Sequence, residues 1–250
     1  MNDIITRMIA NLPMYHRSEL IEAHNIYWSL IRQNLTNVGI DSPEMLSQDA
    51  GEMDVWLKSD LVLSQTCGMP YRIHIHDKVT LIGTPDYGIE GCPSGYYRSA
   101  FVVSKNETRE NLEDFKDALF TFNAEISQSG FAAARAECAK YGFFFANRTC
   151  SGGHLNSAKW VAECRADIAA IDPVSLSLMK RYDEFYDNLK ILCWTDPTPN
   201  LPYISSIDAD KELFFKAIKT AIDELPRKTR DALMIKDLID VPKSTYLAVS

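Results

Sequence analysis

The sequence predicts an α/β fold in two lobes. Short apolar runs recur along the chain, and each ends in a corner rich in glycine, proline or hydroxyl residues that opens a segment with helical spacing. This repeated strand-to-helix order predicts mainly parallel sheets covered by helices. The pattern runs to about residue 100, starts again and runs to about residue 195, and the remaining chain returns. A chain of 250 residues is long enough for two modest lobes with their own cores.

The composition fits an ordinary globular protein and disfavours several partners. Hydrophobic residues make up 46% and charged residues 24%, and the net charge is −8. Nucleic acid and anionic membranes need a basic face, so we expect neither as a partner. No apolar run approaches the roughly 18–20 residues of a membrane span, so membrane insertion is not expected. An anionic ligand would be held by local dipoles and hydrogen bonds.

The start of the chain and its cysteines bear on the compartment. The first sixteen residues, MNDIITRMIANLPMYH, lack the basic stretch and apolar run of a secretory signal peptide, so the chain is expected to stay where it is made. The six cysteines show neither a C-x-x-C pair nor zinc-type spacing, and we expect buried thiols. Cys67 and Cys92 each follow a strand-like run, and they are the one pair to test for a disulfide.

The first lobe opens with a short strand, Met8–Leu12, which Pro13 stops. Tyr15 lies on the loop beyond it, and Ser18 is expected to cap a long amphipathic helix. The next run starts at Asp60 and is almost continuously apolar, as in a strand that is covered on both faces.

Polar residues end that second strand at Gln65 and Thr66. Ligands of open α/β sheets gather at the carboxyl ends of the strands, so both are candidate site residues. A further strand, Val79–Gly83, leads into a glycine-rich loop with Tyr97, and Arg98–Ser104 leaves the lobe.

The sequence IHIHD places two histidines in alternation. His74 and His76 would share one face of a strand beside Asp77. Two ligands without a clear third do not make a metal site, so we expect a solvated pair and no metal.

The second lobe contains the corner that organises our interpretation. An apolar run, Ala118–Phe122, is followed by Ser127, Gln128, Ser129 and Gly130 and then by an alanine-rich helix. Helix starts have unpartnered N–H groups and the positive end of the dipole, so this corner predicts a cradle for a small anion. The alternative is that the serines only cap the helix.

Two more corners follow. Phe143–Ala146 is expected to be an aromatic strand, and a glycine-rich corner ending at His154 opens the next helix. The strand Ile168–Ile171 ends in Asp172, and Pro173 suits the first turn of a helix. Three strand ends therefore deliver the serines, His154 and Asp172. The alternatives are a structural turn histidine and a helix-capping carboxylate.

The end of the chain completes the lobes. Leu189–Trp194 is a further strand, a proline-rich segment leads to Tyr203–Ser206, and residues 209–225 and 228–239 are helical by periodicity. We expect lobe I to comprise residues 1–100 and 196–250, and lobe II residues 101–195.

Six segments taken together resemble the phosphonate/phosphate-type solute-binding proteins of ABC importers. They read DLVLSQTCGMP, LIGTPDYGIEGCPSGYYRS, ISQSGFAA, SGGH, RADIAAIDPVS and PNLPYISS, and the resemblance extends from Leu12 to Ser206. It implies a type 2 periplasmic-binding-protein fold. Such a fold has two α/β lobes with mixed, mainly parallel sheets, two hinge crossings, here near residues 98–104 and 192–205, and a ligand cleft between the lobes.

The resemblance also implies roles for these residues. Ser127, Gln128, Ser129 and Gly130 match a serine-rich helix N-terminus that receives phosphonate or phosphate oxygens, and His154 matches a donor to the same oxyanion.

Further matches concern the walls of the cleft. Tyr15 and Tyr97 match aromatic residues of the first-lobe wall, with ordinary packing as the alternative. Asp172 matches a carboxylate that binds a ligand amine or accepts a proton from a protonated oxyanion. No cofactor is implied.

Two features depart from the family pattern. Gln128 stands where a small hydroxyl residue is expected, which leaves the anion open among phosphonate, phosphate and phosphite. The family is periplasmic, whereas no leader is visible. The chain has therefore lost its leader, has a different true start, or is a cytoplasmic relative with a sensing role.

Three functions fit these observations. The first is a non-enzymatic binding protein that closes over a phosphorus oxyanion and is read by an ABC permease. The second is an enzyme on the same fold, of the cofactor-precursor synthase or lyase type, that uses Cys150, His154 and Asp172. The third is a sensor. An enzyme needs an activated nucleophile or base, whereas a binding protein needs only convergent donors, and we expect the binding protein.

Overall fold

The computed structural model describes residues 8–48 and 52–249. The first seven residues, part of the segment searched for a signal peptide, lie outside the described residues. The chain divides into two compact units. Unit 1 consists of the chain up to residue 88 together with residues 199–249, and unit 2 consists of residues 89–198. The sequence placed these divisions near residues 100 and 196.

Unit 1 is built on a five-stranded mixed sheet in the order β1-β2-β11-β3-β12. β1 pairs parallel with β2, whereas β11 and β12 pair antiparallel with their neighbours. The strands are β1 (Ile9–Asn11), β2 (Leu61–Gln65), β3 (Val79–Asp86), β11 (Tyr203–Ser206) and β12 (Asp237–Ile239).

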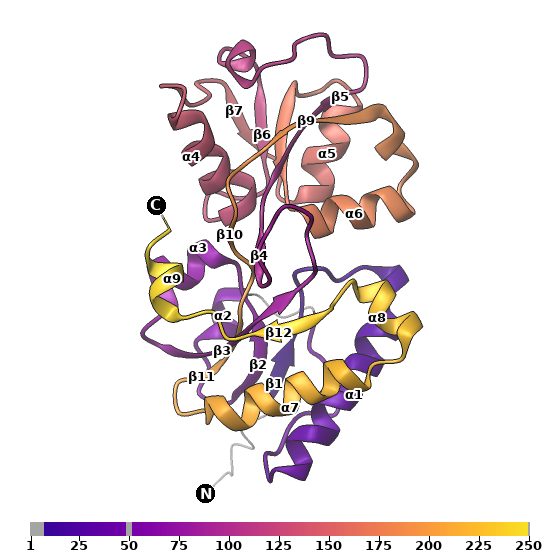
Figure 1. Cartoon of the computed structure of the whole chain (residues 1–250), viewed down its shortest axis with the longest axis vertical. Helices are drawn as coiled ribbons and strands as arrows, with labels where there is room; N and C mark the ends of the chain where they lie inside the picture. Colours follow the sequence, from indigo (N-terminus) through magenta and orange to yellow (C-terminus); the bar gives the residue numbers. More distant parts are fainter. Residues whose placement is uncertain (1–7, 49–51, 250) are drawn as a thin grey trace, which may run out of the picture. The chain divides into compact units, whose positions relative to one another are not determined.

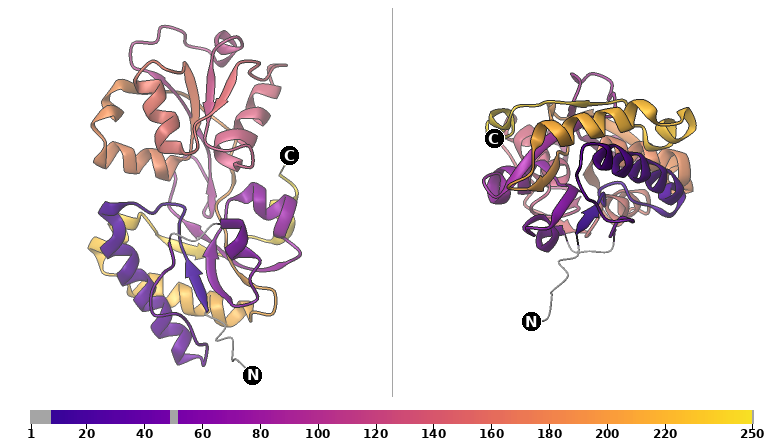
Figure 2. Two further views of the ribbon diagram at one scale, coloured as in Figure 1. Left: turned by 180° about the vertical axis from the view of Figure 1, so that it is seen from behind. Right: turned by 90° about the horizontal axis from the view of Figure 1, so that it is seen from below.

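Two long helices of unit 1, α1 and α7, lie side by side (Figures 1 and 2). Each buries an apolar stripe at helical spacing, which is the reason that these segments fold as helices. A separate apolar cluster joins α2, the helical turn at 71–75 and α9 to the sheet. The helices are α1 (Ile21–Asn37), α2 (Glu52–Trp56), α3 (Gly68–Pro70), α7 (Lys211–Glu224), α8 (Arg227–Leu233) and α9 (Lys243–Leu247).

Unit 2 contains a second five-stranded sheet, in the order β7-β6-β8-β5-β9. β6 pairs parallel with both β7 and β8, and β5 pairs antiparallel with β8 and β9. Successive residues of β5 enter two different apolar clusters, one under α4 and one under α5, so helices cover both faces (Figure 1). The strands are β5 (Ala100–Ser104), β6 (Phe120–Phe122), β7 (Arg148–Cys150), β8 (Ile168–Ile171) and β9 (Leu189–Trp194).

The remaining elements of unit 2 are helices and a short ribbon. The helices are α4 (Ala133–Ala139), α5 (His154–Ala162) and α6 (Pro173–Tyr182). A π-helical turn, Gln128–Ala132, leads directly into α4. β4 (Tyr96–Tyr97) pairs with β10 (Thr198–Pro199) as a separate two-stranded sheet, and the chain passes from unit 2 to unit 1 within β10. The predicted mixed α/β architecture is confirmed.

The histidine-containing run was predicted wrongly as a strand. Residues Tyr71–Ile75 are helical and continue α3. Tyr71 and Ile75, four residues apart, are fully buried, whereas Ile73 is 43% exposed. The apolar period is therefore helical, and the alternation of Ile73 with Ile75 is misleading.

Three other local predictions were wrong. The segment Phe143–Ala146, predicted as a strand, is irregular in the structure, and its aromatic rings pack into the core of unit 2. The strand of this region comes later, at Arg148–Cys150. The helix predicted over 228–239 ends early, because Met234 adopts a left-handed conformation (φ 58°) and β12 follows. Ser18 caps nothing: its hydroxyl donates to Glu19 beside it, and Arg17 holds the N-cap position.

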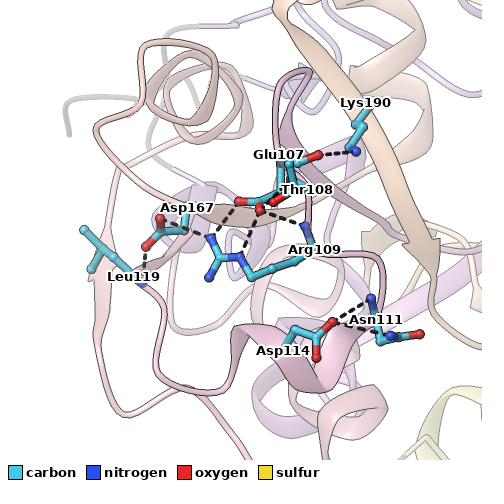
Figure 3. A network of polar contacts seen from close by, with 8 residues as sticks. All are labelled: Glu107, Thr108, Arg109, Asn111, Asp114, Leu119, Asp167 and Lys190. Atoms are coloured by element: carbon cyan, nitrogen blue, oxygen red, sulfur yellow. Dashed lines mark hydrogen bonds and ion pairs between the residues drawn. The ribbon is translucent and has the colours of Figure 1, made fainter.

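An ion-pair network fixes the loop after β5 in unit 2 (Figure 3). The Glu107 carboxylate accepts hydrogen bonds from the backbone N–H groups of Thr108 and Arg109, and Arg109 Nη2 lies 2.6 Å from Glu107 Oε2. Arg109 also reaches Asp167, whose carboxylate accepts from the backbone of Leu119. The guanidinium of Arg109 holds the pKa of Glu107 at about 2.

Replacing Glu107 by glutamine should destabilise unit 2 in a pH-dependent way. The folded-state pKa of Glu107 lies below its unfolded value, so its stabilisation is present above about pH 4.5 and is lost as the pH falls toward 2. We expect Glu107→Gln to lower the free energy of unfolding by about 1 kcal/mol at pH 7, as measured by urea titration. The difference between the two proteins should shrink as the pH falls below 4.5 and should vanish only near pH 2. Glu110→Gln, at an exposed neighbouring position, is the control, and a difference that is as large at pH 3 as at pH 7 would contradict the prediction.

Candidate functional site

The predicted anion cradle begins at Ser127, at the end of the turn that follows β6. Ser127 is the N-cap of the helical segment that starts at Gln128, and its Oγ accepts a hydrogen bond of 3.0 Å from the backbone N–H of Gly130. The backbone N–H groups of Gln128 and Ser129 belong to the first turn, where no intrahelical acceptor exists. The capping interpretation is therefore confirmed for Ser127. Its hydroxyl still keeps one hydrogen to donate, because the cap uses only an oxygen lone pair.

A second corner lies beside the first, because β6 and β7 are parallel neighbours. After β7, Ser151 turns back onto the end of β6, and its backbone N–H and its hydroxyl both donate to the carbonyl of Phe122. Gly153 is the extended N-cap of α5, and His154 is the first residue of that helix. The end of β6 thus holds both corners in place.

Ser129 and His154 meet at these two corners. Ser129 Oγ lies 2.8 Å from His154 Nε2, and His154 Nδ1 has no partner among the described residues. Burial lowers the pKa of His154 to about 4, so the ring is neutral at pH 7. In one tautomer His154 Nε2–H donates to Ser129 Oγ, and the serine hydroxyl keeps its own hydrogen to donate. In the other tautomer the serine hydroxyl donates to Nε2, and His154 Nδ1–H is the donor that remains. Either way, the pair retains one donor for a ligand.

Asn123 belongs to this cluster, although the sequence did not single it out. It follows β6 directly, and its Oδ1 is buried with no partner in the described part of the chain. A Cβ on Gly130 would lie 1.9 Å from Asn123 Oδ1 and 3.2 Å from His154 Cε1. Neighbouring side chains therefore lie directly against Gly130. The sequence did contain one indication of this role, because Asn123 is a polar residue directly after a predicted strand.

Asp172 follows β8, the other parallel neighbour of β6. Its Oδ1 accepts a hydrogen bond of 2.8 Å from the backbone N–H of Ser175, and Pro173 occupies the first helical turn. The structure therefore confirms the helix cap that the sequence left as an alternative. Asp172 is 1% exposed.

Two of the predicted site residues of unit 1, Tyr15 and Gln65, share Tyr87 as a partner, whereas Thr66 bonds locally. Tyr15 packs edge-on against Tyr87, with 5.2 Å between ring centroids. Gln65 Nε2 donates to the hydroxyl of Tyr87 and to the carbonyl of Leu201, and Thr66 Oγ1 donates to the carbonyl of Cys67.

Tyr97, the other predicted residue of the first-lobe wall, belongs to β4 in unit 2 and is 1% exposed.

Several other features bear on chemistry. Within the described residues, no three side chains of His, Cys, Asp or Glu come together as metal ligands. All six cysteines are thiols, so the Cys67–Cys92 disulfide is absent. Cys138 is buried, whereas Cys150 and Cys164 are exposed, contrary to the expectation of buried thiols. Over residues 8–48 and 52–249, no helix has the length and apolar character of a membrane span.

A protein-family comparison matches residues 60–243. The family is described as "ABC transporter, phosphonate, periplasmic substrate-binding protein". A comparison with curated protein sequences gave no match.

Solved structures share the fold. XAC2383 from Xanthomonas citri, bound to chloride ion, has a TM-score of 0.70 at 13% identity, covering 95% of this chain and 92% of its own. PhnD1 from Prochlorococcus marinus, in complex with methylphosphonate, has a TM-score of 0.69 at 17% identity, covering 96% and 94%. A binding protein component of an ABC phosphonate transporter from Pseudomonas aeruginosa has a TM-score of 0.69 at 15% identity, covering 94% and 82%.

Adding a methyl group at Gly130 should disrupt the cluster. Because a Cβ would lie 1.9 Å from Asn123 Oδ1, Gly130→Ala should lower the free energy of unfolding by about 1–3 kcal/mol in a urea titration. Removing the clashing side chain in Asn123→Ala/Gly130→Ala should recover part of this loss. Gly153→Ala is the matched control, because a Cβ there meets nothing within 4 Å. Equal stability of the Gly130 and Gly153 variants would contradict the packing.

The partly buried His154, whose ring is neutral at pH 7, should make stability depend on pH. Since the folded-state pKa is about 4 and the ordinary value is 6.5, the unfolded state binds the proton first as the pH falls. The free energy of unfolding should therefore fall between about pH 6.5 and 4, and this part of the slope should be missing in His154→Gln. Urea titrations at pH 7 and 5 measure it. His74→Gln, at an exposed histidine, should keep the wild-type slope, and an unchanged slope in His154→Gln would refute the burial of a neutral ring.

Proposed function

Because the chain belongs to the phosphonate periplasmic substrate-binding proteins of ABC transporters, we propose that its cradle binds a small phosphorus oxyanion, namely phosphonate, phosphate or phosphite. Members of this family bind ligands for ABC transport and are not enzymes. The observation that carries the proposal is the Ser129–His154 pair at the start of a helix, which in either tautomer keeps one hydrogen without an acceptor among the residues that the structure describes.

The cradle offers neutral donors to a negative charge. The candidates are the hydroxyl of Ser127, the Ser129–His154 pair and the first-turn N–H groups of Gln128 and Ser129. Hydrogen bonds to an ionised acceptor contribute roughly 1.5–3 kcal/mol each, and the helix dipole adds to them. A protein with a net charge of −8 can hold an anion in this way without a basic residue.

The contacts in unit 2 do not favour the enzyme alternative. Cys150 Sγ donates to the carbonyl of Asn123, while His154 Nε2 pairs with Ser129. A nucleophilic cysteine needs a base within hydrogen-bond reach. His154 Nε2 is paired with Ser129 and not with Cys150. We propose that the role of Asp172 is to hold α6, and that an ABC permease reads the ligand-bound protein. The proposal covers all three anions, phosphonate, phosphate and phosphite. It also covers a sensing role for the ligand-bound protein.

Thermal unfolding with candidate anions tests the cradle. A phosphorus oxyanion at about 100 times its dissociation constant should add roughly 2.7 kcal/mol of stability. We expect this for at least one of phosphate, phosphite, methylphosphonate and 2-aminoethylphosphonate, and not for sulfate. Ser127→Ala and His154→Ala should abolish the shift.

Ser177→Ala is the matched control, because this serine bonds to a backbone carbonyl within α6. No stabilisation by any of the four anions, or an undiminished shift in both cradle variants, would reject the proposed function. Turnover of a candidate substrate would favour the enzyme.

A further inference from the structure

The helix that follows the cradle, α4, carries a buried carboxylate. Glu137 is 8% exposed, and its neighbours on α4, Ala134 and Cys138, pack into the apolar core of unit 2. Carboxylates are almost never buried to this degree unless they are paired, because the loss of water around the charge has to be offset. The partners of Glu137 therefore indicate what this position does.

The carboxylate of Glu137 binds the segment by which the chain leaves unit 2. Its Oε2 accepts a hydrogen bond of 3.2 Å from the backbone N–H of Asp196 and one of 2.8 Å from Lys140 Nζ, and Lys140 Nζ also lies 2.6 Å from Asp196 Oδ2. Asp196 lies between the end of β9 and β10, where the chain passes to unit 1. We call residues 195–197 the connecting segment. Glu137 thus ties α4 to the connecting segment.

The connecting segment is itself held in unit 2. The backbone N–H of Thr195 donates to the carbonyl of Ser99 at 3.0 Å, and Thr195 Oγ1 accepts from the backbone N–H of Ser99 at 2.9 Å. Ser99 directly precedes β5, which is a strand of the unit 2 sheet. The N–H of Asp196 is therefore a fixed point, and its bond to Glu137 determines the rotation of α4 about the helix axis.

A π-helical turn lies between the cradle and α4. Its hydrogen bonds run from the N–H of Ala132 to the carbonyl of Ser127 and from the N–H of Ala133 to the carbonyl of Gln128, each five residues back. Such turns are rare and are frequent at functional sites. A π-turn holds one residue more than an α-turn, and one residue corresponds to about 100° of helix rotation. A rotation of α4 would therefore convert this turn and displace the cradle residues from His154.

Two sets of contacts fix the ends of the helical segment 128–139. At its start, Ser129 Oγ contacts His154 Nε2. At its end, the core packing involves small side chains, whose apolar contacts have no direction, whereas the hydrogen bond between Glu137 and the N–H of Asp196 is directional and charge-assisted. The Glu137 contact is thus the part of the far anchor that specifies one rotation of α4.

We propose that Glu137 is a positioning residue for the cradle: its bond to Asp196 fixes the rotation of α4, preserves the π-turn and keeps Ser129 against His154. This inference rests on the proposed function, in which the cradle binds the anion. Coupling between two sites is reciprocal, so an anion in the cradle stabilises the Glu137–Asp196 bond by the factor by which that bond raises anion affinity. The connecting segment of unit 2 thereby responds to the ligand.

Amide hydrogen exchange of the wild-type protein, measured by NMR, tests the coupling. The probes are inorganic phosphate and methylphosphonate. We expect the Asp196 amide to exchange at least about fivefold more slowly when the tighter-binding probe saturates the protein. The Lys105 amide is the matched control, because it donates to the carbonyl of Asn188, also in unit 2, and not to a residue of α4. Its exchange rate should change less than that of Asp196.

Isothermal titration calorimetry of variants tests the positioning role. Glu137→Ala removes the acceptor and should weaken binding of the same probe at least about fivefold. Glu137→Gln keeps an oxygen that can accept from Asp196 N–H and should restore most of the affinity. Glu163→Ala removes an exposed carboxylate just beyond α5, the helix that begins with His154, and should bind as the wild type does. If Glu137→Ala does not fold, the exchange rates of the wild type still decide.

The outcomes distinguish the inference from its premise. Exchange of the Asp196 amide that slows no more than that of Lys105, or wild-type affinity in Glu137→Ala, would overturn the inference. Equal losses of affinity in Glu137→Ala and Glu137→Gln would also overturn it, since charge and not the hydrogen bond would then be responsible. If the wild type binds neither probe nor the other anions of the thermal test, the proposed function itself is rejected.

Discussion

The parallel pairing of β6 with both β7 and β8 is the constraint on which the candidate site depends. Parallel neighbours end at the same edge of a sheet, so the corners after these three strands must lie side by side. The carbonyl of Phe122 at the end of β6 accepts two hydrogen bonds from Ser151, which fixes the second corner onto the first. The contact between Ser129 and His154, residues 25 positions apart, follows from this arrangement.

The electrostatics of the site follow from burial. A histidine within a covered corner is neutral at pH 7, because desolvation disfavours its charged form. His154 therefore adds no formal positive charge to the proposed cradle, and in our proposal binding relies on hydrogen-bond direction and on the helix start. Directional neutral donors distinguish anions by the number and placement of their oxygens more than by total charge. Such a site suits a protein that must both capture and release its ligand.

The sequence predicted the strand ends well, because apolar runs stopped by Gly, Pro or hydroxyl residues are local features. It placed Ser127, Ser129 and Asp172 after their strands correctly, whereas the strand before His154 is Arg148–Cys150 and not the predicted Phe143–Ala146. It failed where tertiary contacts decide. Tyr71–Ile75 is helical because of what it buries, and α8 ends at Met234 without the usual glycine.

Residues identified only by the structure show a different limit of sequence reasoning. Asn11, Asn123 and Asn200 are ordinary polar residues in the sequence, and what distinguishes them is an amide group with one atom unused. That property depends on partners that are distant in the sequence. Ser64, which donates to the amide oxygen of Asn11, lies 53 positions further along the chain. No local pattern contains it.

Capping a helix and binding a ligand are compatible roles for a hydroxyl group but compete for a carboxylate. Ser127 accepts the N–H of Gly130 through a lone pair, and its hydrogen remains to be donated to an anion. Asp172 has only acceptor atoms, and one of its oxygens already holds Ser175 N–H. A cap made by serine therefore adds a donor to the cradle, whereas a cap made by aspartate supplies negative charge that an anion avoids. The chemistry of the two caps, more than their position, separates the residue that we assign to the ligand from the one that we assign to the fold.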